Sequence, residues 1–297
     1  MSRDSAIYVL GLLIVFPFSL LSAIVFTHLL SQDQYGDLGI LFLFAGFLTF
    51  AENLVTLQGT FSYVYGGGDD EGKLDDEDDA ESTNKRRAMT TGALAMLAVI
   101  AALSLPLVLF ADTIAGWLIR DPESGDAIVW AVASAATGAL WRPALNLFRL
   151  ERRPKSFAAL SGLRPVVVLA VSIPLVTSGF GVNGALMGTA FGTLASVAVC
   201  ALLLPSLFTS DVSRTDLRAI TSRGGKRIPT MVALWTLHNA DLFYLSRFAT
   251  AADLSLYRLA SRFASVPSYF SSGFFLAWGP LRRTSVFRAA TEEDAAY

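Results

Sequence analysis

The stretch "GFGVNGALMGTAFGTLASVAVCALLLPSLF" (residues 179–208) carries no charged side chain and decides the fold class. A helix needs about 20 consecutive apolar residues to cross a bilayer, and this stretch is longer than that. The chain is 53% hydrophobic and 16% charged, whereas a soluble domain carries about 25% charged residues. Apolar runs of spanning length fall at residues 6–30, 38–64, 88–111, 126–148, 156–178, 182–208, 228–249 and 254–280. We therefore predict an all-α polytopic membrane protein with about eight transmembrane helices.

The basic residues predict which side of the membrane each connection faces, because Lys and Arg near span ends stay in the cytoplasm. With the N-terminus inside, 17 of the 23 Lys and Arg residues fall in cytoplasmic segments. Only Arg120 and Arg247 fall outside, and the other four lie within spans. We therefore expect a multi-pass protein of the cytoplasmic membrane with both termini in the cytoplasm.

Two stretches have a distinctive composition. Residues 66–87 ("GGGDDEGKLDDEDDAESTNKRR") place nine acidic side chains between positions 69 and 81. Like charges at this density repel one another, which predicts a disordered cytoplasmic loop rather than a calcium site. In the opening stretch, Gly184, Gly188 and Gly192 recur every four residues, so one helix face is small enough for a neighbouring helix to approach closely.

The chain contains a weak internal repeat. A shift of 219 residues lays "LLSQDQYGDLGILFLF" (29–44) over "FATAADLSLYRLASRF" (248–263). Both segments join an apolar span to an amphipathic helix through a short polar turn. From this repeat we expect a six-helix first lobe at 1–208, a cytoplasmic linker at 209–227, the first two helices of a second lobe at 228–281, and a cytoplasmic tail at 282–297.

Several motifs together resemble one known family, the polysaccharide flippases of the multidrug/oligosaccharidyl-lipid/polysaccharide exporter (MOP) superfamily. "LSQDQYGDLGILFLFAGFL" (30–48) resembles the first external turn and second helix of these proteins. "SGFGVNGALMGTAFG" (178–192) is similar to their glycine-rich turn into the sixth helix, and "FRLERRPKSF" (148–157) to their basic connection between the fourth and fifth helices.

The end of the chain also resembles this family. "DLFYLSRF" (241–248) followed by "DLSLYRLASRF" (253–263) looks like the seventh and eighth helices. Ser255 stands where the family usually has Gly, and Arg258 where a small residue is common. The resemblance implies two lobes around a central cavity, so this chain would lack most of the second lobe. It also implies a flippase for polyprenyl-diphosphate-linked oligosaccharides of the O-antigen type, working by alternating access.

Six charged residues lie within the predicted spans. They are Arg142, Arg164, Arg258 and Arg262, with Glu52 and Asp241. A charge at mid-bilayer costs at least about 2.5 kcal/mol, so such residues face a cavity or a partner. Arginine binds phosphate oxygens through two parallel hydrogen bonds, which suits the diphosphate of a lipid-linked sugar. We therefore expect the four arginines to include the substrate contacts.

The acidic residues have a different expected role. Glu52 and Asp241 would orient the arginines or respond to a coupling ion, H⁺ or Na⁺, and His238 is a further candidate for proton coupling. Structural roles remain open as well. Asp241 with Arg258, or Glu52 with Arg164, would serve as ion pairs between helices, and His238 as a packing residue.

The sequence also bears on three alternatives to a flippase. A drug or cation exporter would carry surplus acid in its cavity, whereas this chain has surplus arginine. An integral-membrane glycosyltransferase would place carboxylates in or beside a large extramembrane loop, and no phosphate loop, metal-ligand cluster or nucleophile motif is found. A non-transporting half-module stays open. We expect no enzyme activity, no cofactor and no nucleic-acid partner, but contacts with membrane lipids and either self-association or a separate second lobe.

Overall fold

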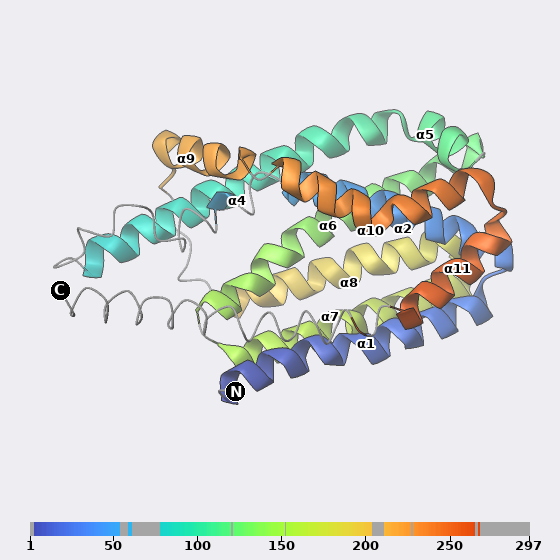
Figure 1. The fold of residues 1–297 in the computed structure, drawn as a ribbon, viewed down its shortest axis with the longest axis horizontal. Coiled ribbons are helices and arrows are strands. Elements are labelled where there is room, and N and C mark those ends of the chain that lie inside the picture. The colour runs from blue at the N-terminus through green and yellow to red at the C-terminus, as the bar shows by residue number, and fades with distance from the viewer. Residues whose placement is uncertain are drawn as a thin grey trace, which may run out of the picture.

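The computed structural model describes residues 3–53, 59–60, 78–119, 121–151, 153–203, 211–226, 228–264 and 267. Within these ranges the chain is helical and contains no strand. The elements are α1 (Arg3–Leu29), α2 (Gln32–Asn53), α4 (Asp78–Leu109), α5 (Ala111–Leu118), η1 (Pro122–Ser124), α6 (Gly125–Leu150), α7 (Pro154–Leu175), η2 (Val176–Phe180), α8 (Gly181–Leu203), α9 (Arg214–Gly225), α10 (Ile228–Phe248) and α11 (Ala251–Ala264). Their long helices lie side by side in one elongated bundle, which confirms the predicted all-α fold (Figure 1).

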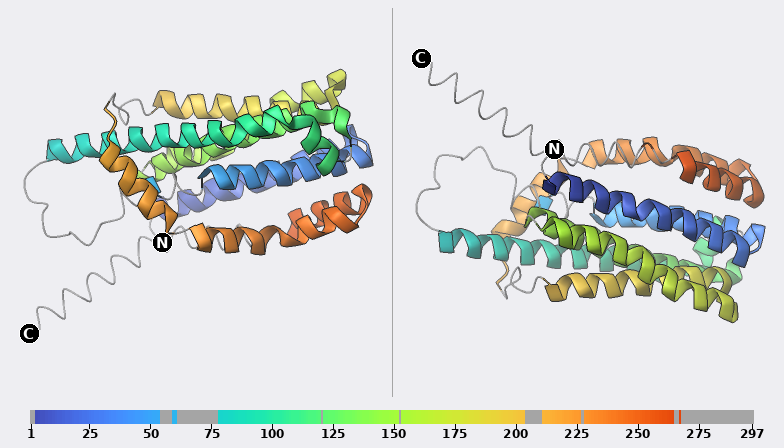
Figure 2. Two further views of the ribbon diagram at one scale, coloured as in Figure 1. Left: turned by 90° about the horizontal axis from the view of Figure 1, so that it is seen from above. Right: turned by 90° about the horizontal axis from the view of Figure 1, so that it is seen from below.

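The two ends of the bundle differ. At the turn end, short connections follow α1, α4, α7 and α10, and the small helices α5 and η1 lie there. At the linker end lie the N-terminus, the start of α4, and α9, which crosses the axis of the bundle (Figure 2).

The second helix begins earlier than its apolar run. The hydroxyl of Ser31 accepts a hydrogen bond from the Gln34 amide, and the Gln34 side chain accepts one from the Ser31 amide. This reciprocal pair is a capping box, which satisfies two amides that a helix start leaves open. Hence α2 starts at Gln32 rather than at the predicted position 38. Of the predicted span 38–64, residues 54–58 and 61–64 lie outside the described part.

The predicted disordered loop at 66–87 is wrong over its last ten residues, because α4 begins at Asp78. Acidic composition and helix formation are compatible, because negative charge near the start of a helix interacts favourably with the helix dipole. Residues 66–77 of the predicted loop lie outside the described part of the chain.

Glycines let α7 and α8 approach each other closely. A Cβ built at Gly184 would lie 2.9 Å from the backbone carbonyl carbon of Leu175, and one at Gly188 would lie 2.4 Å from Cα of Ser172. A Cβ at Gly192 would lie 2.6 Å from Cα of Val168. The turn between the two helices holds Gly179 at φ 95° and Gly181 at φ 51°, conformations that glycine adopts without strain. The predicted packing role of the glycine repeat is confirmed.

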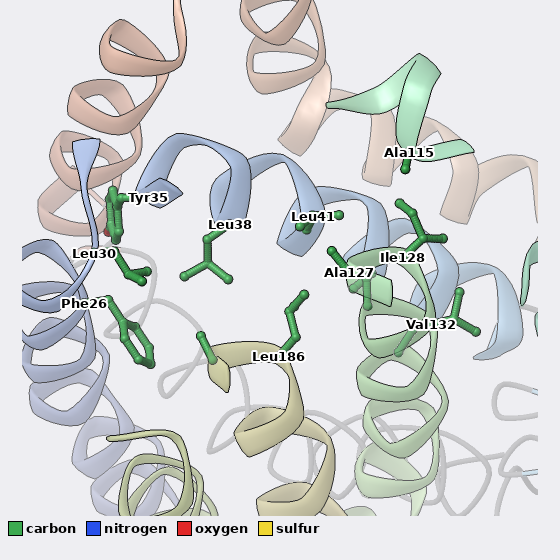
Figure 3. Packing of buried hydrophobic residues seen from close by; sticks show 14 of the residues in the cluster. Phe26, Leu30, Tyr35, Leu38, Leu41, Ala115, Ala127, Ile128, Val132 and Leu186 are labelled. Carbon is green, nitrogen blue, oxygen red and sulfur yellow. The ribbon is translucent and has the colours of Figure 1, made fainter. Parts of the chain in front are cut away.

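The main core joins the helices near the turn end (Figure 3). Phe26 and Leu30 from α1 and the following turn, Leu38 and Leu41 from α2, Ile128 and Val132 from α6, and Leu186 from α8 form part of it. Leu41, Ile128 and Leu186 are 0% exposed. Full burial of such a side chain contributes roughly 1.5–3 kcal/mol. The core therefore ties α1, α2, α6 and α8 into one unit, and Ala115 of α5 and Leu169 of α7 also belong to it.

The outer surface of the bundle is apolar. Leu105, Leu109 and Leu202 are more than 60% exposed, and exposed leucines on this scale suit a lipid-facing surface. In the described residues, three stretches are long and apolar enough to cross a membrane: Gln32–Asn53, Arg86–Leu109 and Pro154–Leu203, the last covering both α7 and α8. These observations support the predicted membrane protein.

The last two helices pack against α2. Trp235 of α10 lies edge-on to Phe47 at 4.8 Å between ring centroids and stacks on Phe50 at 5.9 Å. Helix α11 also runs along α2, and Leu254 on α11 is 3% exposed. The division into a first lobe at 1–208 and the start of a second at 228–281 stays a prediction, as does the extension of the eighth span beyond α11.

Candidate functional site

Arg164 stands in the middle of α7 and is held there by two neighbours. Its Nε donates a 3.1 Å hydrogen bond to Oγ1 of Thr193 on α8, a side chain that is 0% exposed. The Arg164 guanidinium carbon lies 5.8 Å from the ring centroid of Trp141 on α6, within cation–π range. Because its hydroxyl and aromatic partners come from different helices, the guanidinium has a defined position between α6, α7 and α8.

The structure brings Arg142 and Arg164 together. Arg142 follows Trp141 on α6, and the Trp141 ring lies beside the Arg164 guanidinium, so α6 carries Arg142 to the place where Arg164 lies. Arg142 is exposed and Arg164 is half-buried, so the pair has an accessible member and an enclosed one. Two positive charges at this position favour an anion that contacts both. We call Arg142, Arg164, Trp141 and Thr193 the arginine site.

Glu52 lies in the last described turn of α2 and is 0% exposed. Its Oε1 accepts a 3.2 Å hydrogen bond from the Ser104 hydroxyl on α4. Nearby on α2, the Thr49 hydroxyl donates to the Ala135 carbonyl of α6, and the Asn53 amide donates to the Thr49 carbonyl. Glu52 thus belongs to a polar group at the contact of α2, α4 and α6. Its predicted coupling role stays a prediction.

Asp241 of α10 accepts a hydrogen bond from the Tyr257 hydroxyl of α11. The two residues are nearly equidistant from the connection at residues 249–250, so the α10–α11 hairpin places them opposite each other. Asp241 is exposed, so among the described residues its carboxylate lies at the surface of the helix bundle. The structure therefore gives Asp241 a tyrosine partner.

Three other predicted site residues are placed only by their backbone. Arg258 and Arg262 lie one turn apart on α11, and His238 is the middle residue of α10. Their side chains are outside the described part of the structure. In the described ranges, no group of three or more His, Cys, Asp or Glu side chains could hold a metal ion.

The sequence analysis missed the neutral members of these sites. Trp141 directly precedes Arg142, and Thr193 lies within the glycine-rich helix, but neither is unusual in a membrane span. Tyr257 was the most accessible to prediction, because its distance from the polar turn mirrors that of Asp241. Ser104 carries no signal in the sequence, since its contact with Glu52 depends on how α2 and α4 cross.

The fold is that of transporters. VcmN, a MATE transporter of Vibrio cholerae solved as an Asp-to-Asn mutant, matches with a TM-score of 0.61 and 18% identity over 94% of this chain and 64% of its own. A MOP-superfamily transporter from Pyrococcus furiosus, described as having a binding pocket of reverse polarity that suggests a different function, matches with a TM-score of 0.54 and 14% identity over 93% and 67%. A third structure, named protein A, matches with a TM-score of 0.72 and 14% identity over 94% of this chain and 63% of its own.

A family match makes the assignment more specific. Residues 78–274, well over half of the chain, match the family described as polysaccharide biosynthesis protein, and this chain belongs to that family. The predicted resemblance is confirmed by membership of a polysaccharide biosynthesis family together with the fold of MOP-superfamily transporters. No curated protein matches the chain in sequence. The chain spans roughly two thirds of the length of the transporters that share its fold.

Proposed function

We propose that this protein translocates a polyprenyl-diphosphate-linked oligosaccharide across the cytoplasmic membrane for cell-surface polysaccharide synthesis. The observation that carries the proposal is an arginine held inside a bundle of apolar helices: Arg164 donates to Thr193 and lies beside Trp141, which Arg142 directly follows in the chain. Membership of a polysaccharide biosynthesis family and a transporter fold support the same conclusion. These comparisons also make a transporter a better description than an enzyme.

The arginine site suits the diphosphate of such a substrate. Two guanidinium groups side by side repel each other, and a diphosphate between them replaces this repulsion with charge-assisted hydrogen bonds. Thr193 and Trp141 hold Arg164 before the substrate arrives, so less side-chain freedom is lost on binding. Arg142, being exposed, would meet the substrate first, and the sugars would remain on the accessible side.

Alternating access would require the rest of the proposed cavity. In the proposal, helices α10 and α11 begin the opposing lobe, with Arg258 and Arg262 as further phosphate contacts. Glu52, Asp241 and His238 are the proposed responders to H⁺ or Na⁺. The other half of the cavity would come from a second lobe or from a partner copy. Both termini and α9 would face the cytoplasm.

A translocation assay tests this proposal. The protein, purified from its source membrane, is reconstituted into vesicles, and movement of a fluorescent polyprenyl-diphosphate oligosaccharide between leaflets is followed. One lost charged hydrogen bond costs about 1.5–3 kcal/mol, so Arg142→Ala or Arg164→Ala should weaken substrate use roughly tenfold or more. Arg153→Ala, which removes an exposed arginine from the connection between α6 and α7, is the matched control and should transport normally. Unchanged transport in both site variants would contradict the proposal.

A further inference from the structure

Helix α9 lies across the bundle where α4 enters its apolar stretch. The apolar part of α4 that is long enough to cross a membrane begins at Arg86. Arg87, the next residue, donates from Nε to Oδ2 of Asp216 on α9 at 3.0 Å, and the Ser213 amide donates to Oγ1 of Thr91 at 3.1 Å. These contacts place α9 at the level of one membrane surface, crossing the bundle axis (Figure 2).

One face of α9 is anchored in the protein. Asp216 is 3% exposed, Ile220 is 0% exposed, and Gly224 completes the same stripe at four-residue spacing. A Cβ built at Gly59 would lie 2.1 Å from the Ile220 carbonyl oxygen, so the chain following α2 runs directly against α9. This inner face fixes the rotation of the helix about its own axis.

The opposite face is basic, and its side chains are exposed among the residues that the structure describes. Arg214 and Arg218 lie one turn apart on it and are exposed, as is Thr221, which follows on the same face. Leu217, at the border of this face, is 38% exposed, and Val212 just before the helix is 57% exposed. A basic stripe flanked by exposed apolar side chains is typical of a helix that lies in the headgroup region of a membrane.

We propose that the face of α9 defined by Arg214, Leu217 and Arg218 binds anionic phospholipid headgroups of the surrounding bilayer. The two guanidinium groups complement the negative headgroups, while Leu217 reaches the upper acyl chains. In the chain, α9 lies between α8 and α10. This contact therefore holds the connection between the predicted first lobe (1–208) and the start of the second (228–281) at the membrane surface. The proposal does not depend on the transported substrate.

Lipid contact is measured on the full chain in nanodiscs. Ser222→Cys, an exposed position beside the basic face, carries a fluorophore in a Cys200→Ala background that removes the buried native thiol. The probes are phosphatidylglycerol and phosphatidylcholine with spin-labelled headgroups, added in turn to the same phosphatidylcholine nanodisc. Stronger quenching by phosphatidylglycerol, reduced by high salt, supports the proposal. Equal quenching by the two lipids overturns it.

Variants identify the residues responsible. R214Q and R218Q should each lower the preference for phosphatidylglycerol roughly fivefold, because a basic residue near an anionic surface contributes about 1 kcal/mol. K155Q is the matched control, since Lys155 is exposed at the start of α7 and should leave the preference unchanged. An unaltered preference in R214Q/R218Q contradicts the assignment.

A second occupant is tested in the same series. The acid-rich residues 69–77 of this chain carry charge opposite to that of α9. If neutralising those acids, rather than adding anionic lipid, changes the emission of the label and its salt dependence, the basic face is covered by the chain itself and the lipid proposal is overturned. The comparison of the two lipids leaves Arg214 and Arg218 in place, so it decides the matter even if R214Q/R218Q fails to fold.

Discussion

Nε of Arg164 lies 3.1 Å from Oγ1 of Thr193, so a guanidinium on α7 is held by a hydroxyl that α8 buries completely. Glycines at the α7–α8 contact bring the two helices close enough for this bond to form. The small-residue stripe therefore has a consequence beyond packing, because it positions one of the two arginines proposed to bind substrate.

Thr193→Val should weaken transport without removing the arginine. Valine fills the same space, but Nε of Arg164 loses its acceptor, which costs about 1–3 kcal/mol when a buried donor is left unsatisfied. We expect a lower transport rate and a lower melting temperature, measured by vesicle flux and tryptophan fluorescence. Thr189→Val is the control on the same helix, because Thr189 bonds only its own helix at Ala185. Equal effects of the two changes would argue against a specific role for Thr193.

Gly188→Ala should destabilise the protein strongly. The new Cβ would lie 2.4 Å from Cα of Ser172, so the backbones of α7 and α8 would have to separate. Overpacking of this kind costs about 1–3 kcal/mol. Gly46→Ala is the control, since a Cβ at Gly46 meets nothing within 4 Å and alanine is the better helix former. Thermal unfolding in detergent should separate the two, and a Gly188→Ala protein as stable as the wild type would refute the close approach.

Asp216→Asn should loosen α9. The amide keeps the shape of the side chain but removes the negative charge that faces Arg87 across 3.0 Å. Because Asp216 is 3% exposed, losing one member of the pair costs about 1–3 kcal/mol. Hydrogen exchange over residues 214–225 should speed up. Arg86→Gln, at the exposed neighbour of Arg87, should leave the exchange rate unchanged.

Tyr257→Phe should slow transport while leaving the melting temperature nearly unchanged. The lost hydroxyl donates to Asp241, and both residues lie on the accessible side of the α10–α11 hairpin, where a hydrogen bond contributes little to stability. A carboxylate proposed to take part in coupling would lose its fixed orientation. Tyr244→Phe is the control on α10, where the ring packs on Phe248. Normal flux in Tyr257→Phe would remove the hairpin pair from the mechanism.

The helices could be predicted largely from the sequence, because long apolar runs leave the backbone no partner but itself in a bilayer. Helix boundaries were less accessible. Ser31 and Gln34 start α2 through a local capping box, and the acidic start of α4 is helical although its composition suggests a loop. A high content of charged residues predicts that a segment stays in contact with water. It does not predict whether that segment is helical.

The candidate site could be predicted in part. Arginines within apolar runs are conspicuous, and the structure brings Arg142 and Arg164 together. Their neutral partners could not be predicted, because Thr193 and Trp141 are ordinary residues until helix packing places them beside a charge. The proximity of Ser104 and Glu52 likewise depends on the crossing of α2 and α4.

The central claim is that the protein selects its substrate by the diphosphate, through Arg142 and Arg164. The most direct test compares the movement of two lipids with the same oligosaccharide and the same polyprenyl chain, one joined through a diphosphate and the other through a neutral ether. The protein from its source membrane should translocate the diphosphate lipid much faster, and Arg142→Ala/Arg164→Ala should abolish the difference. Equal translocation of both lipids by the unmodified protein would contradict the claim.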